Sequence, residues 1–252
     1  MSVIAVTQAR FGSSRLPGKV LKEINGKTLL QIHLERISLA HSIDKVIVAT
    51  TMEPEASRIC SIAHSLGLGS YQGSLADVLD RYYNAVSALR PDWVVRITSD
   101  CPLLDPRIID EIVTFTLDGS LDYVSNSVVR TYPDGMDVEV FSFGALETAW
   151  KEAALPSERE HVTPYIWKNC DVNGGRLFRG GNFTYSRDLS AVRLTVDELP
   201  DFELVGKLVD ALGTDAPWES YVDYMHAHPH LLEINRQFQI NEGYARSLEK
   251  DH

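Results

Sequence analysis

The apolar run VIAV at positions 3–6 leads through Thr7 into the loop QARFGSSRLPGK at positions 8–19. This loop contains small residues and three cations, Arg10, Arg15 and Lys19. A short apolar run followed by a loop of small residues is typical of a parallel strand whose carboxyl end presents backbone N–H groups to a ligand. Three cations within about ten residues favour a polyphosphate as that ligand. The stretch therefore predicts an α/β sheet with a phosphate-binding loop after its first strand.

Two common phosphate-binding patterns do not fit this loop. A Walker loop places four residues between its glycines and follows the lysine with Ser or Thr, whereas Gly12 and Gly18 are six positions apart and Val20 follows the lysine. The dinucleotide fingerprint is best approximated near Gly67, which follows an expected helix instead of a strand. An ordinary solvated basic loop is the structural alternative. The chain holds 24 Lys and Arg against 35 Asp and Glu, so this local group of cations stands out.

The composition describes a globular protein with one large domain. Its 252 residues are 44% hydrophobic and 23% charged, which is enough apolar content for a full core. The net charge of −11 argues against nucleic acid or an anionic membrane as a partner. The first residues do not resemble a signal peptide, and no apolar run is long enough to span a bilayer. Three cysteines without CxxC spacing are expected to be free thiols, which fits a cytoplasmic location.

Short apolar runs alternate with helical patterns through the first two-thirds of the chain. Strands are expected at 3–6, 45–49 and 93–98, because these runs are short and rich in β-branched residues. Helices are expected after local start patterns, namely capping boxes at 28–31 and 74–77, Pro54, and the pair Asp105-Pro106. The alternation predicts an α/β fold with a mostly parallel twisted sheet flanked by helices.

After about residue 120 the regular alternation ends. Shorter strands are expected at 123–126, 138–142, 176–178, 182–185 and 192–196, with helices at 144–153 and 157–168. We interpret residues 122–190 as a mixed region that extends the sheet and supplies acceptor and dimer contacts. Helices are then expected at 200–212 and 218–226, before a polar tail. The expected organisation is an α/β domain over 1–212 and a helical C-terminal extension over 213–252.

Two aspartates directly follow expected strands. Asp100 comes after the strand at 93–98, and Asp197 comes after the strand at 192–196. Each aspartate alone is equally well explained as a helix N-cap, but Asp105 and Asp201 are better placed for capping. Mg²⁺ prefers one or two carboxylates together with phosphate oxygens of a substrate. Loop cations and strand-end carboxylates together predict a metal-assisted phosphoryl or nucleotidyl transfer site.

Several separated motifs resemble one enzyme family. They are QARFGSSRLPGK with VLKEINGKTLL, VIVATT, YQGSLADVLDRYYNA, VVRITSDCPLLDPRIID, TYPDGMDVEVFS, SEREHVTPYIW and LTVDELPDFELV, in order from about residue 3 to 206. The family comprises the cytidylyltransferases that activate bacterial surface sugars, such as CMP-Kdo and CMP-sialic acid synthetases, and the spore coat polysaccharide branch is the most similar. The resemblance implies a nucleotide-diphospho-sugar transferase-like fold, Mg²⁺-dependent transfer of CMP from CTP, release of pyrophosphate, and a homodimer.

The same resemblance assigns roles to individual residues. Arg15 and Lys19 are expected to neutralise charge on the leaving pyrophosphate, and Asp100 and Asp197 to bind the metal. The expected nucleotide contacts are Ala9, Arg10, Gly12, Ser13, Arg15, Lys19, Thr50, Gly73, Ser74, Thr98 and Asp100. In its middle third the chain departs from the CMP-Kdo and CMP-sialic acid members. The residues there that we ourselves assign to the acceptor, a small acidic or hydroxylated molecule, are Asp137, Glu139, Glu160 and His161.

For several residues, and for the activity, the sequence also allows a second interpretation. A capping box at 157–160 gives His161 a structural alternative on a first helical turn. Cys101 has no base in its sequence context, so a buried thiol is expected there instead of a nucleophile. The tract HAHPH is interrupted by Pro229 and lacks a fourth ligand for zinc. A sugar-1-phosphate nucleotidyltransferase that uses another nucleotide, and a catalytically silent binding module with this fold, are the alternative functions.

Overall fold

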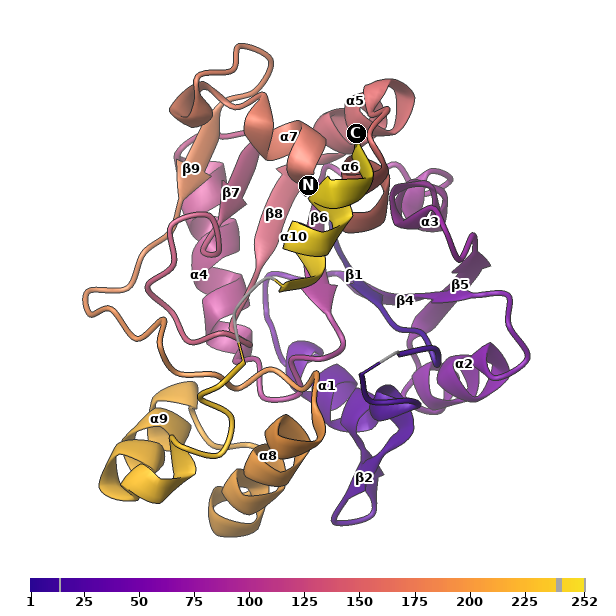
Figure 1. Cartoon of the computed structure of the whole chain (residues 1–252). Helices are drawn as coiled ribbons and strands as arrows, with labels where there is room; N and C mark the ends of the chain where they lie inside the picture. The colour runs from indigo at the N-terminus through magenta and orange to yellow at the C-terminus, as the bar shows by residue number, and fades with distance from the viewer. Residues whose placement is uncertain (14, 239–241, 252) are drawn as a thin grey trace.

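The computed structural model describes residues 1–13, 15–238 and 242–251. Seven strands form one sheet in the order β5-β4-β1-β6-β8-β7-β9, and two more form a small hairpin (Figure 1). The strands are β1 (Val3–Gln8), β2 (Glu23–Ile24), β3 (Lys27–Thr28), β4 (Lys45–Thr51), β5 (Gly69–Gly73), β6 (Trp93–Thr98), β7 (Tyr123–Ser125), β8 (Glu139–Ser142) and β9 (Gly180–Asn182).

The helices connect and cover these strands. They are α1 (Leu29–Ile37), α2 (Ala56–Ser65), α3 (Val78–Val86), α4 (Pro106–Asp118), α5 (Phe143–Glu152), α6 (Pro156–His161), α7 (Pro164–Lys168), α8 (Leu199–Leu212), α9 (Trp218–Ala227) and α10 (Glu242–Leu248). Within the described residues, no helix combines the length and apolar character needed to cross a membrane.

The strand order places a topological switch point beside β1. Strands β5, β4, β1 and β6 run parallel, whereas β8 is antiparallel to both of its neighbours, β6 and β7. The chain passes from β1 to β4 on one side and later returns to β6 on the other side. At the carboxyl ends of these two strands, Gln8 is the register partner of Thr98. Ligands of open α/β sheets bind at such a point.

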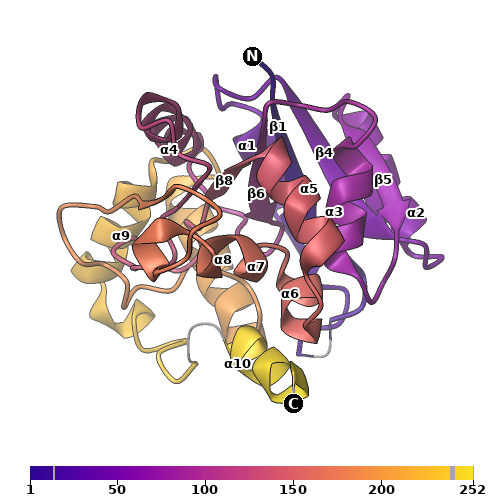
Figure 2. The same ribbon diagram turned by 90° about the horizontal axis from the view of Figure 1, so that it is seen from above.

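The alternating residues of β1 face two separate hydrophobic cores. Val3 and Ala5 face the core formed with α1, α2, α4, α8 and α9. Ile4 and Val6 face the second core, which α3, α5 and α7 cover. Figure 2 shows α3 and α5 together on that side of the sheet. Both faces of the central strands are therefore buried, as expected for parallel strands.

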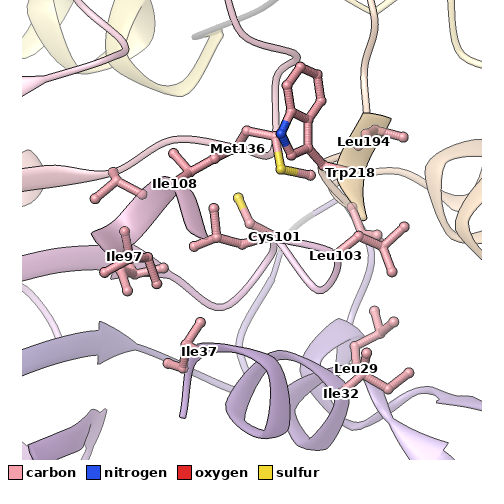
Figure 3. Packing of buried hydrophobic residues seen from close by; sticks show 14 of the residues in the cluster. Leu29, Ile32, Ile37, Ile97, Cys101, Leu103, Ile108, Met136, Leu194 and Trp218 are labelled. Carbon is pink, nitrogen blue, oxygen red and sulfur yellow. The ribbon is translucent and has the colours of Figure 1, made fainter. Parts of the chain in front are cut away.

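The loop after β6 is anchored in the larger core. Cys101 and Leu103 are buried there together with Ile108 of α4 (Figure 3). Met136 and Leu194 approach the same cluster from two distant segments. This packing holds the backbone around position 100 in a fixed position.

The predicted mostly parallel sheet with a mixed extension is confirmed, but several element boundaries are wrong. The strand expected at 192–196 is an extended segment with a single bridge, between Asp134 and Arg193. The strand expected at 176–178 is only a bridge at Phe178, and the one at 182–185 lies earlier, at β9. Strand β5 was not predicted. Its sequence, GSYQG, has glycines at both ends and pairs on only one side, so it carries little β pattern.

Two helix starts also differ from the prediction. The helix expected at 157–168 is two short helices, because Val162 has a φ of 72° between them. The first begins after Leu155, with Glu158 and not Glu160 completing the capping box. The helix expected from Ser74 begins at Val78, and its N-cap is Asp77, which accepts a hydrogen bond from the Asp80 N–H. Ser74 instead accepts a bond from the Asp77 N–H.

Candidate active site

The loop after β1 bends back so that Lys19 faces the carboxyl end of the sheet. The Gly18 N–H donates to the Phe11 carbonyl at 3.1 Å, and Gly18 has a φ of 66°. A Cβ atom at Gly18 would lie 3.0 Å from the Phe11 ring, so both the conformation and the space require glycine. Val20 and Leu21 are buried directly after the lysine and anchor this part of the loop.

Lys19 brings the two predicted strand-end aspartates together. Its Nζ atom lies 3.0 Å from Asp100 Oδ2 and 2.7 Å from Asp197 Oδ1, and it also donates to the Val196 carbonyl at 3.0 Å. Burial disfavours the charged ammonium group, but the two carboxylates outweigh burial and raise the pKa of Lys19. Burial likewise opposes the charge of Asp100, but Lys19 and Thr98 hold the pKa of Asp100 well below its usual value.

Asp197 is positioned by the segment that precedes α8. The Val196 N–H donates to the Asp100 carbonyl at 2.7 Å, which ties this segment to the loop after β6. The N–H groups of Asp197 and Glu198 donate to Asp201 Oδ2 at 3.0 and 2.9 Å. Arg15 reaches the same carboxylate, with its Nη2 2.8 Å from Asp197 Oδ2. Arg15, Lys19, Asp100 and Asp197 therefore form one cluster, as predicted.

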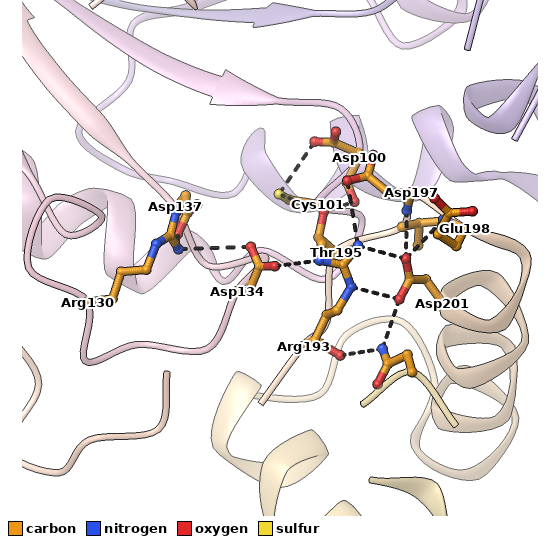
Figure 4. Close-up of polar contacts among 12 residues, drawn as sticks. Asp100, Cys101, Arg130, Asp134, Asp137, Arg193, Thr195, Asp197, Glu198 and Asp201 are labelled. Carbon is orange, nitrogen blue, oxygen red and sulfur yellow. Dashed lines mark hydrogen bonds and ion pairs between the residues drawn. The ribbon is translucent and has the colours of Figure 1, made fainter. Parts of the chain in front are cut away.

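The buried side chain of Arg193 stabilises the segment that positions Asp197. Arg193 donates from Nε and Nη2 to Asp201, both at 2.9 Å, and from Nη1 to Asp134 at 2.9 Å (Figure 4). Nearby, Arg130 makes two parallel hydrogen bonds of 2.8 Å to Asp137. The extended segment around Arg193 is thus held by ion pairs and by backbone hydrogen bonds to Asp134 and Asp100, without a regular strand ladder.

A cavity of about 490 Å³, which we call the loop cavity, lies beside the loop after β1. Eight predicted nucleotide contacts line it, namely Ala9, Arg10, Gly12, Ser13, Arg15, Lys19, Thr98 and Asp100. Three predicted contacts, Thr50, Gly73 and Ser74, are not among its lining residues. Thr50 is fully buried within β4. Leu75, Ala76, Val78 and Arg81, which the sequence reasoning did not select, form part of the wall instead.

A second cavity of about 450 Å³ adjoins the loop cavity, and we call it the arginine cavity. Its lining includes Arg96, Arg130 and Arg193, none of which was predicted, since no local pattern marks them. Seven residues line both cavities, namely Gln8, Arg15, Thr98, Asp100, His161, Asp197 and Gly243. The two cavities therefore meet at the pair of aspartates.

The residues predicted for the acceptor divide between the two cavities. Asp137, Glu139 and His161 line the arginine cavity, whereas Glu160 lines only the loop cavity. The buried Glu139 carboxylate accepts hydrogen bonds from Tyr123 and Thr163, both at 2.6 Å, and forms an ion pair with Arg96. Its oxygens are thus engaged within the protein.

His161 and Cys101 carry groups whose pKa values are shifted by burial. Burial, followed by the charge of Arg96, lowers the pKa of His161 to about 4, so its imidazole is neutral near pH 7. Its Nε2 lies 2.9 Å from the Ser247 hydroxyl. Burial, followed by the charge of Asp100, raises the pKa of the Cys101 thiol well above its usual value. Cys101 is therefore a protonated, buried thiol and not an activated nucleophile.

Helix α10 closes one side of both cavities. Gly243 and Tyr244 line the arginine cavity, and Gly243 and Lys250 line the loop cavity. The helix is held against α6, because Ser247 hydrogen-bonds to Glu160 and His161 and Asp251 accepts two bonds from Ser157. Figures 1 and 2 show α10 beside α6, and Figure 1 shows it well apart from α8 and α9, which precede it in the sequence. No sequence pattern indicated this placement.

A parallel sheet with a cationic loop and two carboxylates at its switch point is the arrangement of a nucleotidyltransferase. Residues 4–210 match the family model for cytidylyltransferases, and the chain belongs to that family. The predicted membership and enzyme class are confirmed.

Two relatives extend over most of the chain. An uncharacterized protein of Methanocaldococcus jannaschii is 39% identical over 238 residues, which are 93% of this chain and 95% of that protein. The spore coat polysaccharide biosynthesis protein SpsF of Bacillus subtilis is 30% identical over 220 residues, covering 84% of this chain and 88% of that protein. The predicted similarity to the spore coat branch is confirmed.

Two solved structures have the same fold. A cytidylyltransferase from Leptospira borgpetersenii serovar Hardjo-bovis is 31% identical, with a TM-score of 0.86 over 96% of this chain and 100% of that one. CMP:2-keto-3-deoxy-manno-octonic acid synthetase, solved in complex with CTP, is 19% identical, with a TM-score of 0.62 over 84% of this chain and 99% of that one. The second likeness concerns the fold alone.

Proposed function

We propose that this cytidylyltransferase transfers CMP from CTP to a hydroxyl group of a small acidic sugar or similar acceptor, with release of pyrophosphate. The reaction depends on Mg²⁺ and serves the biosynthesis of a surface polysaccharide, in the cytoplasm and in a homodimer. Family membership supports the transfer chemistry. The family description supports a cytidine nucleotide, and the name of the spore coat relative supports the pathway.

One observation carries the proposal: the loop cavity and the arginine cavity meet at Asp100 and Asp197. A transfer reaction needs two substrates whose reacting atoms meet at one point, where charge is neutralised. The loop cavity is lined by the cations Arg10, Arg15 and Lys19, which suit a triphosphate. The arginine cavity leaves room for an acceptor on the other side of the carboxylate pair.

The two aspartates fit a divalent cation. Both carboxylates are directed at a single positive group, the ammonium nitrogen of Lys19. Two carboxylates completed by phosphate oxygens are a preferred ligand set for Mg²⁺. Asp100 and Asp197 would hold the ion, which supplies charge neutralisation at the phosphate oxygens when it is bound. With an ion held there, the ammonium group of Lys19 would be available to donate to a phosphate oxygen of the substrate.

The remaining roles belong to the loop and to the junction of the cavities. The backbone around Gly12 and Ser13 and the side chain of Arg10 hold the triphosphate. The acceptor hydroxyl attacks the α-phosphorus in line, so that an oxygen–phosphorus bond forms as the bond to the departing pyrophosphate breaks. Arg15 and Lys19 neutralise the charge on that leaving group, and each such contact contributes about 10²–10³ to the rate.

The acceptor contacts that we propose lie in the arginine cavity. Asp137 and the neutral imidazole of His161 face this cavity and suit hydroxyl groups. Glu139 contributes indirectly, because its ion pair with Arg96 fixes the guanidinium in the wall. Glu160, which lines the other cavity, would contact the acceptor only near the junction.

A pyrophosphate-release assay tests the proposal. The purified protein is incubated with Mg²⁺, each of CTP, UTP, GTP and ATP, and a panel of acidic and neutral sugars. We expect release with CTP and an acidic sugar, and Asp100→Asn or Asp197→Asn to reduce it about 10²–10³-fold. Asp118→Asn, on the exposed end of α4, is the matched control.

Three results would reject parts of the proposal. Turnover with UTP or GTP and a sugar phosphate would assign the enzyme to the sugar-1-phosphate class. Binding of CTP without turnover on any acceptor would favour a silent binding module. Wild-type turnover in both aspartate variants at saturating Mg²⁺ would reject the metal ligands.

A further inference from the structure

Helix α10 is attached to the protein by polar contacts and not through either hydrophobic core. Among the described residues, the buried members of the two cores end at Leu231 and the partly buried ones at Ile234. Within residues 243–251, Ser247 alone is buried, at 2% exposed. A hydrogen bond inside a protein replaces one with water, so contacts of this kind break at a small net cost in free energy.

Ser247 joins α10 to the end of α6, and we call this contact the latch. Its hydroxyl donates to Glu160 Oε2 at 2.9 Å and lies 2.9 Å from His161 Nε2. In the first turn of α6, Ser157 donates to Asp251 from its N–H at 2.9 Å and from its hydroxyl at 2.6 Å. These contacts join one short helix to another, so they can break without disturbing either core.

The latch lies at the edge of both cavities. Gly243 of α10 lines the two cavities, Tyr244 lines the arginine cavity and Lys250 lines the loop cavity. On the other side of the latch, His161 lines both cavities and Glu160 lines the loop cavity. A closed latch therefore covers the proposed substrate positions and holds two residues that face them. Such a cover favours a transfer reaction, because it keeps water away from the reacting phosphate.

We propose that α10 is a movable lid, which opens at the latch to admit the nucleotide and the acceptor and closes over them. The open form is a minor state of the free protein, in which water takes over the polar contacts of Ser247 and Asp251. Pyrophosphate and the product leave when the lid opens again. The identity of the substrates rests on the proposed function, whereas the movement of α10 does not.

The movement is tested first without any ligand. In Cys60→Ser the two remaining cysteines, Cys101 and Cys170, are buried, so they react with a thiol reagent only when the cores open. Into this background we introduce Ser247→Cys at the latch or Ala245→Cys on the exposed face of α10. Mass spectrometry of the peptides then gives the labelling rate of each position.

We expect labelling at position 247 to be about 10- to 1000-fold slower than at 245, as an open state populated at about 0.1–10% requires. It should nevertheless be much faster than labelling of Cys170. Equal rates at 247 and 245 would show that the latch is not closed. A rate at 247 as slow as that of Cys170 would make α10 a fixed wall, and either result would overturn the lid.

A reversible lock tests whether the lid controls access. Ser157 and Asp251 are in contact, and neither lines a cavity, so Ser157→Cys/Asp251→Cys is designed to form a disulfide that dithiothreitol removes. Stopped-flow measurements with Mg²⁺ and CTP give the association and dissociation rates of both forms. We expect both rates to fall at least about 10-fold on oxidation and to recover on reduction. Ser157→Cys alone, as the control, should not respond to oxidation.

The outcomes separate the lid from the proposed function. Nucleotide rates that are the same in the oxidised and reduced double variant would overturn the control of access by α10. A reduced form and a wild type that do not bind CTP would overturn the proposed function instead. In that case the labelling comparison between positions 247 and 245 still decides whether α10 opens.

Discussion

The ammonium nitrogen of Lys19 lies 2.7 Å from the carboxylate of Asp197, although 178 positions separate the two residues in the chain. The side chain of Lys19 is 13% exposed, so this ion pair is only weakly screened by water. The same nitrogen also neutralises Asp100. The site therefore already holds one positive charge between its two carboxylates.

Removing this charge should change how the protein responds to Mg²⁺. In Lys19→Met the two carboxylates repel each other, so we expect Mg²⁺ without nucleotide to raise the unfolding temperature more than it does for the wild type. Turnover should fall about 10²–10³-fold. Differential scanning fluorimetry over a Mg²⁺ series measures the first effect. Lys207→Met, on an exposed position of α8, is the control, and an identical Mg²⁺ response in all three proteins would contradict the prediction.

Asp201→Asn should destabilise the fold strongly. Asp201 is fully buried and accepts hydrogen bonds from Arg193, Asn235 and two backbone N–H groups. The substitution leaves Arg193 without its bidentate partner, and breaking a buried ion pair in this way costs about 3–5 kcal/mol. Urea denaturation followed by circular dichroism measures the loss. The exposed Asp223→Asn in α9 should change stability by less than about 0.5 kcal/mol, and equal effects of the two would refute the argument.

Gly135→Ala should disturb the segment that carries Asp197. Gly135 has a φ of 107°, and a Cβ there would lie 2.7 Å from the backbone of Leu194 and Thr195. We expect a loss of at least about 1–3 kcal/mol and reduced turnover, because the backbone around 194–197 must move. Gly206→Ala is the matched control, since its new Cβ would contact only its own turn of helix and α8 should gain about 0.5–1 kcal/mol. Similar stability of both variants would count against this reading.

His33 should make stability depend on pH between about 4 and 6.5. The ring is fully buried between the Thr7 hydroxyl and the Cys101 carbonyl, and burial lowers the pKa of His33 to about 4. The unfolded chain binds a proton at higher pH than the folded protein does. The contribution of His33 to the free energy of unfolding is therefore full above about pH 6.5. It decreases as the pH falls toward 4, by up to about 1.4 kcal/mol per pH unit.

The measurement is the difference in unfolding free energy between the wild type and His33→Gln across that range. Other titrating groups cancel in the difference, so the excess stability of the wild type should shrink as the solution is acidified. If this difference in unfolding free energy stays constant from pH 7 to 4, the pKa of His33 is not lowered in the folded protein.

The central sheet was predictable because buried parallel strands are continuous apolar runs. Strands β4 and β6 have the sequences KVIVATT and WVVRIT, and these apolar runs indicate strands without any knowledge of the strands beside them. The edge strand β5 and the bridge at Arg193 could not be predicted from the sequence, since their conformation depends on the segments with which they pair. The break at Val162 was also missed, since a positive φ at a β-branched residue has no sequence pattern that announces it.

The positions of the loop cations and of Asp100 were predictable, because the loop and Asp100 follow two strands whose carboxyl ends meet at one edge of the sheet. Asp100 was placed correctly by this logic, whereas Asp197 reached the cluster although no strand precedes it. Arg81 and Arg193 were missed, since an arginine in a helix or an extended segment has no local mark that distinguishes it from a surface charge. Their places in the cavity walls appear only in the three-dimensional structure.

Helix α10 lies outside the region that matches the family model, yet it forms part of the walls of both cavities. The family match ends at residue 210, yet Gly243, Tyr244 and Lys250 form part of the cavity walls. Two proteins that agree throughout the matched region can thus keep the same carboxylate pair and cationic loop while differing in the size and polarity of the chamber. Under the proposed function, acceptor choice would then be separable from the transfer chemistry, and exchanging residues 243–250 between relatives would test this.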